Sequence, residues 1–349
     1  MLRLSLAALM LSAALPALAN DSVAEIGAGG IVLARNYEIS LDREDLFLSR
    51  ELVTVDYVFQ NRSDRDVETI VAFPMPAIAG NPDSDIAVPD QESDNFLGFT
   101  VMHDGQAITP NLQQRVFAAG VDVTDEFAGL SIPLMPTGEK TYAALAKLTP
   151  ETVADWENRG IVTVQEWDVG QGMEKHVMPR WELHSAYWWR ATFPAGKAIK
   201  VSHRYKPAAG ATAGLNFYWD GNKSDYWGEY EDKYCIDDGF LKALDKVAAT
   251  GDGMFEGRLD YILTSGGNWA NGTIGEFHLT IDKGKADNLV SFCGKGVKKT
   301  GATRFEMTAK DFWPEKDIHV LYVERYTQEM EATSNLKRQK PVVLKKDGG

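Results

Sequence analysis

After its first twenty residues, the sequence lacks any apolar run long enough to cross a membrane. A transmembrane helix needs roughly 20 consecutive apolar residues, so no spanning helix is expected in the mature chain. Basic residues are also in deficit, 36 against 50 acidic ones, which gives a formal net charge of −14 at pH 7. Nucleic-acid binding requires a basic surface that contacts phosphates. The charge balance therefore excludes nucleic acid as an expected partner.

The sequence also lacks the short motifs by which many enzymes are recognised. It contains no G-x-S-x-G elbow, no H-E-x-x-H zinc motif and no Walker A sequence. The six histidines are scattered along the chain. A glycosidase would leave no such motif, because its two carboxylates are neighbours only in space. The sequence therefore favours a non-enzymatic binding protein, and a glycan-active hydrolase with paired carboxylates between two lobes is the alternative.

The first nineteen residues have the form of an export signal. A basic start, Met1–Arg3, precedes the apolar stretch Leu4–Leu15, and the small residues Ala17 and Ala19 then form an A-x-A cleavage site. We expect cleavage after Ala19, which makes Asn20 the first residue of the mature chain. This predicts a soluble protein in the periplasm or outside the cell.

The sequence has only 2 cysteines, Cys235 and Cys293, and they form an even pair in a chain expected to reach an oxidising compartment. Disulfides persist in such compartments. Neither cysteine belongs to a C-x-x-C motif, and neither has a histidine close by in sequence. We therefore expect a structural disulfide rather than a metal site.

Alternation of apolar and polar residues predicts a mainly β fold with antiparallel, sandwich-like lobes. Two alternating segments on either side of the polar turn 61–66 predict a hairpin, and Asp104-Gly105 predicts a second one. Two short helical insertions interrupt the strands; Thr149 is expected to cap the first, and Asp237 or Asp238 the second. The alternating segments are 53–59, 67–73, 187–193 and 199–205.

A break at Pro207–Ala211 suggests a division of the chain into two lobes. The basic residues at the end of the chain are typical of a disordered tail. The expected parts are a signal peptide (1–19), an N-terminal β lobe (20–207) with a helical insertion near 138–160, a C-terminal disulfide-stapled β lobe (208–336) and a disordered basic tail (337–349).

Residues 81–95 form an acidic segment. Carboxylates at this density can bind Ca²⁺, which prefers six to eight oxygen ligands. A solvated loop is the alternative. The acidic residues are Asp83, Asp85, Asp90, Glu92 and Asp94.

Residues 217–234 form an aromatic segment, with seven aromatic and five acidic residues among eighteen. Tyrosine and tryptophan are common anchors of binding surfaces, so the segment predicts a surface for a glycan or an envelope protein. Packing inside the protein is the alternative. The predicted surface residues are Trp219, Tyr226, Trp227 and Tyr230.

The aromatic segment also carries oxygen-bearing residues at the spacing of an EF-hand loop, so it predicts a structural Ca²⁺ ion; no other cofactor is expected to be required. The match has one departure, because Asp225 stands where the sharp turn of the loop needs glycine. The predicted ligands are Asp220, Asn222, Ser224, Tyr226, Gly228 and Glu231.

Short motifs spread over nearly the whole mature chain carry a family resemblance. They are Asn20-Asp21-Ser22, 25–30, Glu44-Asp45-Leu46, 71–76, 193–196, 263–269, Ser291-Phe292-Cys293 and 296–299. Together they resemble a family of exported bacterial proteins catalogued as domain of unknown function 4424. The resemblance implies an exported bacterial protein, and it brings no catalytic residue with it.

Overall fold

The computed structural model describes residues 20–27, 30–81, 86–168, 170, 172–219 and 221–326. The predicted signal peptide and basic tail lie outside these residues, as do Asp83, Asp85 and Asp220. The described part is mostly β, which confirms the expected fold class. Its helices are α1 (Glu139–Leu145), α2 (Pro150–Asn158), α3 (Trp227–Tyr234) and α4 (Asp238–Ala248), with 3₁₀ turns at Thr124–Phe127, Thr264–Asn268 and Ala270–Gly272.

Three sheets form the body of the molecule, and we name them A, B and C. Sheet A contains β11 (Val121–Asp122), β10 (Asn111–Ala118), β14 (Glu182–Phe193), β5 (Val67–Pro74), β1 (Ser22–Gly27) and β2 (Gly30–Ala34) in spatial order, and β6 (Ile78–Ala79) also pairs with β14.

Sheet B is the largest of the three. It contains, in spatial order, β22 (Lys298–Lys299), β23 (Arg304–Phe312), β20 (Ile274–Asp282), β3 (Ile39–Leu48), β4 (Val53–Asn61), β15 (Ala198–Tyr205), β8 (Thr100–His103) and β9 (Gln106–Ile108).

Sheet C and two small ribbons complete the strands. Sheet C contains β21 (Leu289–Phe292), β24 (Ile318–Arg325), β19 (Met254–Tyr261), β16 (Ala209–Ala211) and β7 (Ile86–Ala87). The ribbons pair β12 (Val162–Asp168) with β13 (Met173–Pro179), and β17 (Tyr218–Trp219) with β18 (Asn222–Lys223).

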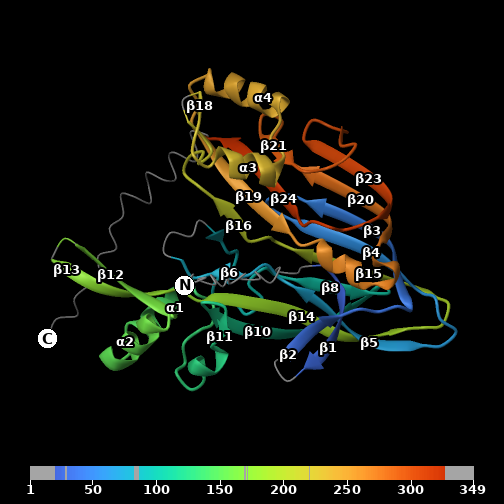
Figure 1. Cartoon of the computed structure of the whole chain (residues 1–349), viewed down its shortest axis with the longest axis horizontal. Coiled ribbons are helices and arrows are strands. Elements are labelled where there is room, and N and C mark those ends of the chain that lie inside the picture. The colour runs from blue at the N-terminus through green and yellow to red at the C-terminus, as the bar shows by residue number, and fades with distance from the viewer. Residues whose placement is uncertain are drawn as a thin grey trace, which may run out of the picture.

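Sheet B packs one face against sheets A and C, and a single hydrophobic cluster joins all three sheets. Figure 1 shows sheet A on one side of the molecule and the strands of sheet C, with α3 and α4, on the opposite side. Strand β4 illustrates the sequence origin of this arrangement: Val53, Val55 and Tyr57 are buried, while Asp56 between them is exposed. Because side chains alternate along a strand, this pattern buries one face of the sheet.

The alternating strands form where they are predicted, but the first predicted hairpin is wrong. Strand β4 pairs with β3 and β15 in sheet B, whereas β5 pairs with β1 and β14 in sheet A. The polar turn between them therefore joins the two layers of the sandwich. Periodicity shows which face of a strand is apolar, and both strands turn that face to the common core. The Asp104-Gly105 hairpin, which joins β8 to β9, is confirmed.

Sheet B also connects the two parts of the chain on either side of residue 208. Strand β3 lies parallel to β20, with Leu46 opposite Leu279. The division into two lobes at residue 208 stays a prediction, and these two parts share both a sheet and a hydrophobic cluster.

Both predicted helix caps are present. The Thr149 side chain accepts a hydrogen bond from the amide of Thr152 at 3.2 Å at the start of α2. At the start of α4, Asp237 Oδ1 accepts one from the amide of Phe240 at 2.7 Å. Such caps satisfy amides that have no partner within the helix.

The predicted disulfide between Cys235 and Cys293 is also present, with its Cα atoms 5.0 Å apart. It joins the end of α3 to the residue after β21, so it connects the helical part of this region to sheet C.

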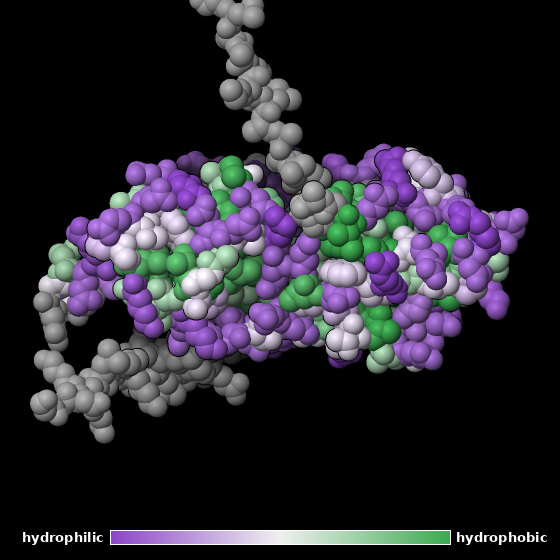
Figure 2. Space-filling model, turned by 90° about the horizontal axis from the view of Figure 1, so that it is seen from below, coloured by the Kyte–Doolittle hydropathy of each residue, from purple (hydrophilic) through white to green (hydrophobic). Residues whose placement is uncertain are grey.

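The outer surface is mostly hydrophilic on the side where sheet A lies. Figure 2 shows separate hydrophobic patches among hydrophilic residues on this face. Two apolar residues of sheet A, Ile26 and Val32, are 57% and 55% exposed. In the described ranges, no helix is both long and apolar enough to span a bilayer.

Candidate functional site

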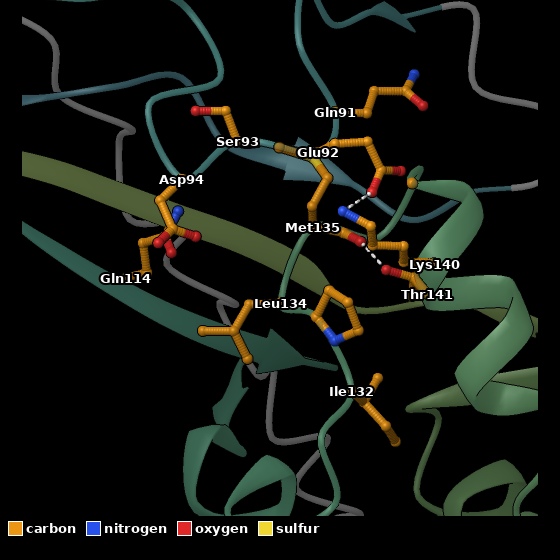
Figure 3. A pocket seen from close by; sticks show the side chains of 12 residues that line it. Gln91, Glu92, Ser93, Asp94, Gln114, Ile132, Leu134, Met135, Lys140 and Thr141 are labelled. Carbon is orange, nitrogen blue, oxygen red and sulfur yellow. Dashed lines mark hydrogen bonds and ion pairs between the residues drawn. The ribbon is translucent and has the colours of Figure 1, made fainter.

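A pocket with a volume of about 270 Å³ lies between the acidic segment, strand β10 and helix α1. In Figure 3, the side chains of the acidic segment lie above the apolar residues Ile132 and Leu134, which we call the floor of the pocket. The lining residues are Gln91, Glu92, Ser93, Asp94, Gln114, Ile132, Pro133, Leu134, Met135, Gly138, Lys140 and Thr141.

An ion pair ties the acidic segment to helix α1 at this pocket. Lys140 Nζ lies 2.8 Å from Glu92 Oε2, and Figure 3 shows the two side chains meeting beside the helix. This hydrogen bond and the charge of Glu92 raise the pKa of Lys140. Thr141 donates a hydrogen bond to the carbonyl oxygen of Met135 at 2.6 Å, which ties the same turn of α1 to the floor. These contacts define one wall of the pocket.

The other polar side chains at the pocket include the carboxylate of Asp94 and the amides of Gln91 and Gln114. Asp94 is exposed, and no other part of the described chain forms an ion pair with it. In Figure 3, Asp94 and Gln114 lie on the side away from α1, and Gln91 lies at the opposite edge. Gln114 also donates to Ser185 Oγ at 3.4 Å. A carboxylate and two amides above an apolar floor suit a small molecule that carries hydrogen-bond donors.

The aromatic segment divides into exposed and buried rings. Trp219 on β17 is 76% exposed and Tyr226 is 60% exposed, whereas Trp227 and Tyr230 on α3 are buried. The Tyr230 ring stacks on Phe217 with ring centroids 4.9 Å apart. Residues three apart share one face of a helix, so α3 turns both of its rings inward. The predicted surface must be corrected: Trp227 and Tyr230 belong to the interior.

The predicted calcium ligands are spread over a hairpin and a helix. Asn222 lies on β18, Gly228 and Glu231 lie on α3, and the Ser224 hydroxyl donates to the carbonyl oxygen of Asn216 at 2.6 Å. Asp220 falls outside the described residues. Within those residues, no cluster of three or more His, Cys, Asp or Glu side chains is placed to hold a metal ion. The calcium site therefore stays a prediction.

A second pocket, of about 330 Å³, lies on the outer face of sheet B between β3, β20 and β23. Two carboxylates, Asp45 and Glu276, line it. Asp45 lies 3.3 Å from His278 Nδ1 and also pairs with Arg43. Burial raises the pKa of Asp45, but Arg43 and His278 outweigh that effect, so the pKa is lowered. A glycosidase acid needs a raised pKa. Asp45 does not fit that role, and the hydrolase alternative stays a prediction.

Sequence reasoning missed a buried polar cluster at the centre of the sandwich. Asp21 Oδ1 lies 2.8 Å from His203 Nε2, and both side chains are 0% exposed. The amide nitrogen of Asn20 donates to Ser265 Oγ at 2.7 Å, and Asn20 Nδ2 donates to Glu44 Oε2 at 3.1 Å. Asn20, Asp21 and Glu44 are fully buried.

The cluster is tightly bonded but has unpartnered atoms. The Tyr57 hydroxyl donates to Asn20 Oδ1 and lies 3.1 Å from the Tyr261 hydroxyl. Three buried atoms of the cluster have no hydrogen-bond partner among the described residues: Asp21 Oδ2, Glu44 Oε1 and His203 Nδ1. Burial raises the pKa of Glu44 to about 8, and the charge of Asp21 adds to that effect, while the hydrogen bond from Asn20 opposes it.

Part of this cluster has a signal in the sequence. His203 alternates in phase with the buried Val201 and Tyr205, and Glu44 alternates with Leu46 and Leu48. A register shift between Leu41 and Arg43 puts Glu44 on the inner face. A polar residue in phase with core residues is a usable signal for a buried polar site.

Comparisons with known proteins agree with the family resemblance. A family model described as "Domain of unknown function (DUF4424)" matches residues 19–321. No curated protein matches the chain. One similar solved structure is a candidate nutrient binding protein from Legionella pneumophila, with 14% identity and a TM-score of 0.42, covering 86% of this chain and 72% of that chain. A likeness at this level says nothing about function.

Proposed function

The chain belongs to the family described as domain of unknown function DUF4424, and we propose that it is a binding protein for a small polar molecule. The proposed site is the pocket between the acidic segment and α1. The observation that carries this proposal is a pocket with an apolar floor that Asp94 and Gln114 line on one side and Gln91 lines at the opposite edge.

The pocket chemistry favours a neutral or cationic ligand with hydroxyl or amine groups. Glu92 is neutralised by Lys140, whereas the carboxylate of Asp94 forms no ion pair with any residue that the structure describes. Carboxylates accept hydrogen bonds and attract cations. The formal net charge of −14 opposes the approach of anions. Sugars, polyols and amines therefore fit better than phosphates or carboxylic acids.

The proposed binding takes place outside the cytoplasm. The predicted export signal and the disulfide between Cys235 and Cys293 both favour an exported protein. The exposed rings of Trp219 and Tyr226 offer a separate contact for a glycan or an envelope protein. That contact is an independent proposal, because neither ring lines the pocket.

Calorimetric titration of the mature protein with monosaccharides, amino acids and polyamines tests the pocket. A compound that binds should lose at least about tenfold in affinity with Asp94→Asn, because a hydrogen bond to a charged group contributes roughly 1.5–3 kcal/mol. Gln114→Ala should also weaken binding. Asp64→Asn is the matched control, since Asp64 lies on an exposed turn that is not part of the pocket.

Two results would count against this function. One is the absence of any heat of binding across the whole panel. The other is a compound whose affinity changes equally in Asp94→Asn and Asp64→Asn, because binding would then depend on net charge rather than on the pocket.

A further inference from the structure

The first residues of the expected mature chain are held in the interior by a segment about 245 positions away. Asn20 donates its backbone nitrogen to Ser265 Oγ at 2.7 Å, and the Ser265 hydroxyl donates back to the Asn20 carbonyl oxygen at 2.8 Å. Trp269 Nε1 donates to the carbonyl oxygen of Asp21 at 2.7 Å, and Asn268 Nδ2 donates to Ser22 Oγ at 2.9 Å. These hydrogen bonds join two of the motifs that carry the family resemblance.

The buried polar cluster contains more acidic side chains than basic ones. Two carboxylates, Asp21 and Glu44, are completely enclosed, and His203 is hydrogen-bonded to Asp21. Each carboxylate keeps one oxygen without a hydrogen-bond partner in the part of the chain that the structure describes. Burying a charge is costly unless it is paired and hydrogen-bonded. Glu44 accepts a hydrogen bond from Asn20 Nδ2 at 3.1 Å and interacts with the Tyr261 hydroxyl, and neither group supplies a countercharge.

We propose that cleavage of the Ala19–Asn20 bond supplies the missing positive charge, as a buried α-ammonium group on Asn20. Hydrolysis by a leader peptidase consumes one water and leaves a carboxylate on Ala19 and an amino group on Asn20. An α-amino group has a pKa of about 7.7–8.0, so it takes up a proton at neutral pH. Its nitrogen is the atom that already donates to Ser265.

The ammonium group changes the charge state of the cluster. The Asn20 ammonium provides a countercharge for the Glu44 carboxylate, which Asn20 already contacts through Nδ2 at 3.1 Å. As an ammonium, the same nitrogen has three donors instead of one. Removal of the leader therefore stabilises the fold, because it completes the cluster that holds strand β1 against the 263–269 segment.

The experiment compares two proteins that share residues 20–349. One begins at Asn20 with a free amino group, and the other carries one additional glycine before Asn20, which keeps that nitrogen an amide. Each is also made with Glu44→Gln. The extra glycine should lower the melting temperature of the Glu44 protein at pH 7 by roughly 4 °C or more, and it should lower that of the Glu44→Gln protein by less than half as much.

The pH dependence follows from the sign of the pKa shift. With an amide at Asn20, the pKa of Glu44 is about 8 in the folded protein against 4.5 for the free side chain. Its contribution to stability is then full below pH 4.5 and is lost as the pH rises to about 8. The ammonium group lowers this pKa, so the free-terminus protein should lose less stability over the same range. The titratable groups that face Glu44 are Asp21, Asp45, Tyr57 and Tyr261, and they are the same in both proteins.

Amine labelling gives a second readout on the protein purified from an exporting host. Acylation at pH 7 followed by peptide mass analysis should find Asn20 at the amino terminus and its α-amine unmodified. Lys140 and Lys175, whose side chains are 70% and 74% exposed, should be acylated in the same sample. After denaturation, the α-amine should react as well.

Three results would overturn the proposal. The first is a mature chain that begins at a residue other than Asn20. The second is a native α-amine that is labelled as fast as Lys175. The third is an extra glycine that has the same effect with Glu44 and with Gln at that position, because the terminal charge would then not act on Glu44.

Discussion

Two tryptophans of the aromatic segment, eight positions apart, differ in burial and should therefore differ in their contribution to stability. Trp227 is 7% exposed and Trp219 is 76% exposed. The Trp227 ring lies 6.1 Å from Phe217, centroid to centroid, and Lys223 Nζ lies 3.9 Å from its centroid. Trp227→Ala removes this packing, whereas Trp219→Ala removes a ring that is mostly in water.

The expected losses differ by several kcal/mol. Truncation of a buried tryptophan to alanine typically costs about 3–5 kcal/mol, and loss of the contact with Lys223 adds to that. The higher helix propensity of alanine in α3 returns roughly 0.5 kcal/mol. We therefore expect Trp227→Ala to lower the free energy of unfolding by about 3 kcal/mol or more. An exposed substitution such as Trp219→Ala should stay within about 0.5 kcal/mol of the parent.

Urea unfolding followed by far-ultraviolet circular dichroism measures both variants. This signal is preferable to fluorescence, because the chain has 9 tryptophans and the loss of one changes the baseline. The Trp227→Ala midpoint should fall while the slope stays unchanged. Equal midpoints for Trp227→Ala and the parent protein would refute the assignment of this ring to the interior, and a large loss for Trp219→Ala would refute its assignment to the surface.

Three further predictions concern two glycines and the disulfide. Gly228→Ala should raise the free energy of unfolding by about 0.5–1 kcal/mol, because a Cβ on this exposed helical residue meets no atom within 4 Å. Gly266→Ala should lower it by about 1–3 kcal/mol, because its Cβ would lie 2.7 Å from Asn20 Nδ2; thermal melts with opposite shifts would confirm the pair. Reduction of the bridge between Cys235 and Cys293, which are 58 residues apart, should cost up to about 4 kcal/mol. Urea unfolding with and without reductant measures this loss, and unchanged midpoints would contradict it.

Local features of the fold could be predicted with confidence from neighbouring residues. The caps at Thr149 and Asp237 use a side chain and an amide that are three positions apart, so a short stretch of sequence contains the whole interaction. The hairpin at Asp104-Gly105 is local for the same reason. The disulfide was predictable because the chain offers only one pair of cysteines.

Strand pairing could not be predicted in the same way. The segments 53–59 and 67–73 are alternating strands joined by a short turn, which is the usual form of a hairpin, yet they lie in different sheets. The apolar face of β4 would be buried equally well whether β5 paired with it in one sheet or faced it from the other sheet across the core. One partner of each strand lies more than a hundred positions away, β15 for β4 and β14 for β5.

Only part of the candidate site could be predicted from the sequence. The acidic segment was recognised, but its meeting with Gln114 and Lys140 depends on where β10 and α1 are placed. Exposure within the aromatic segment was also undetermined, because α3 had not been predicted and its face decides which rings turn inward.

The sequence by itself determined the mainly β class, the disulfide, the acidic character and the family of this protein, because each depends on composition, on local spacing or on motifs read in order. Only the tertiary structure decided that three sheets share one core, that Trp227 is interior while Trp219 is exposed, and that Asn20 meets Glu44 and Ser265. The physical reason is that burial and hydrogen bonding depend on distance in space. Folding brings together residues that are hundreds of positions apart, and no local pattern encodes which of them will meet.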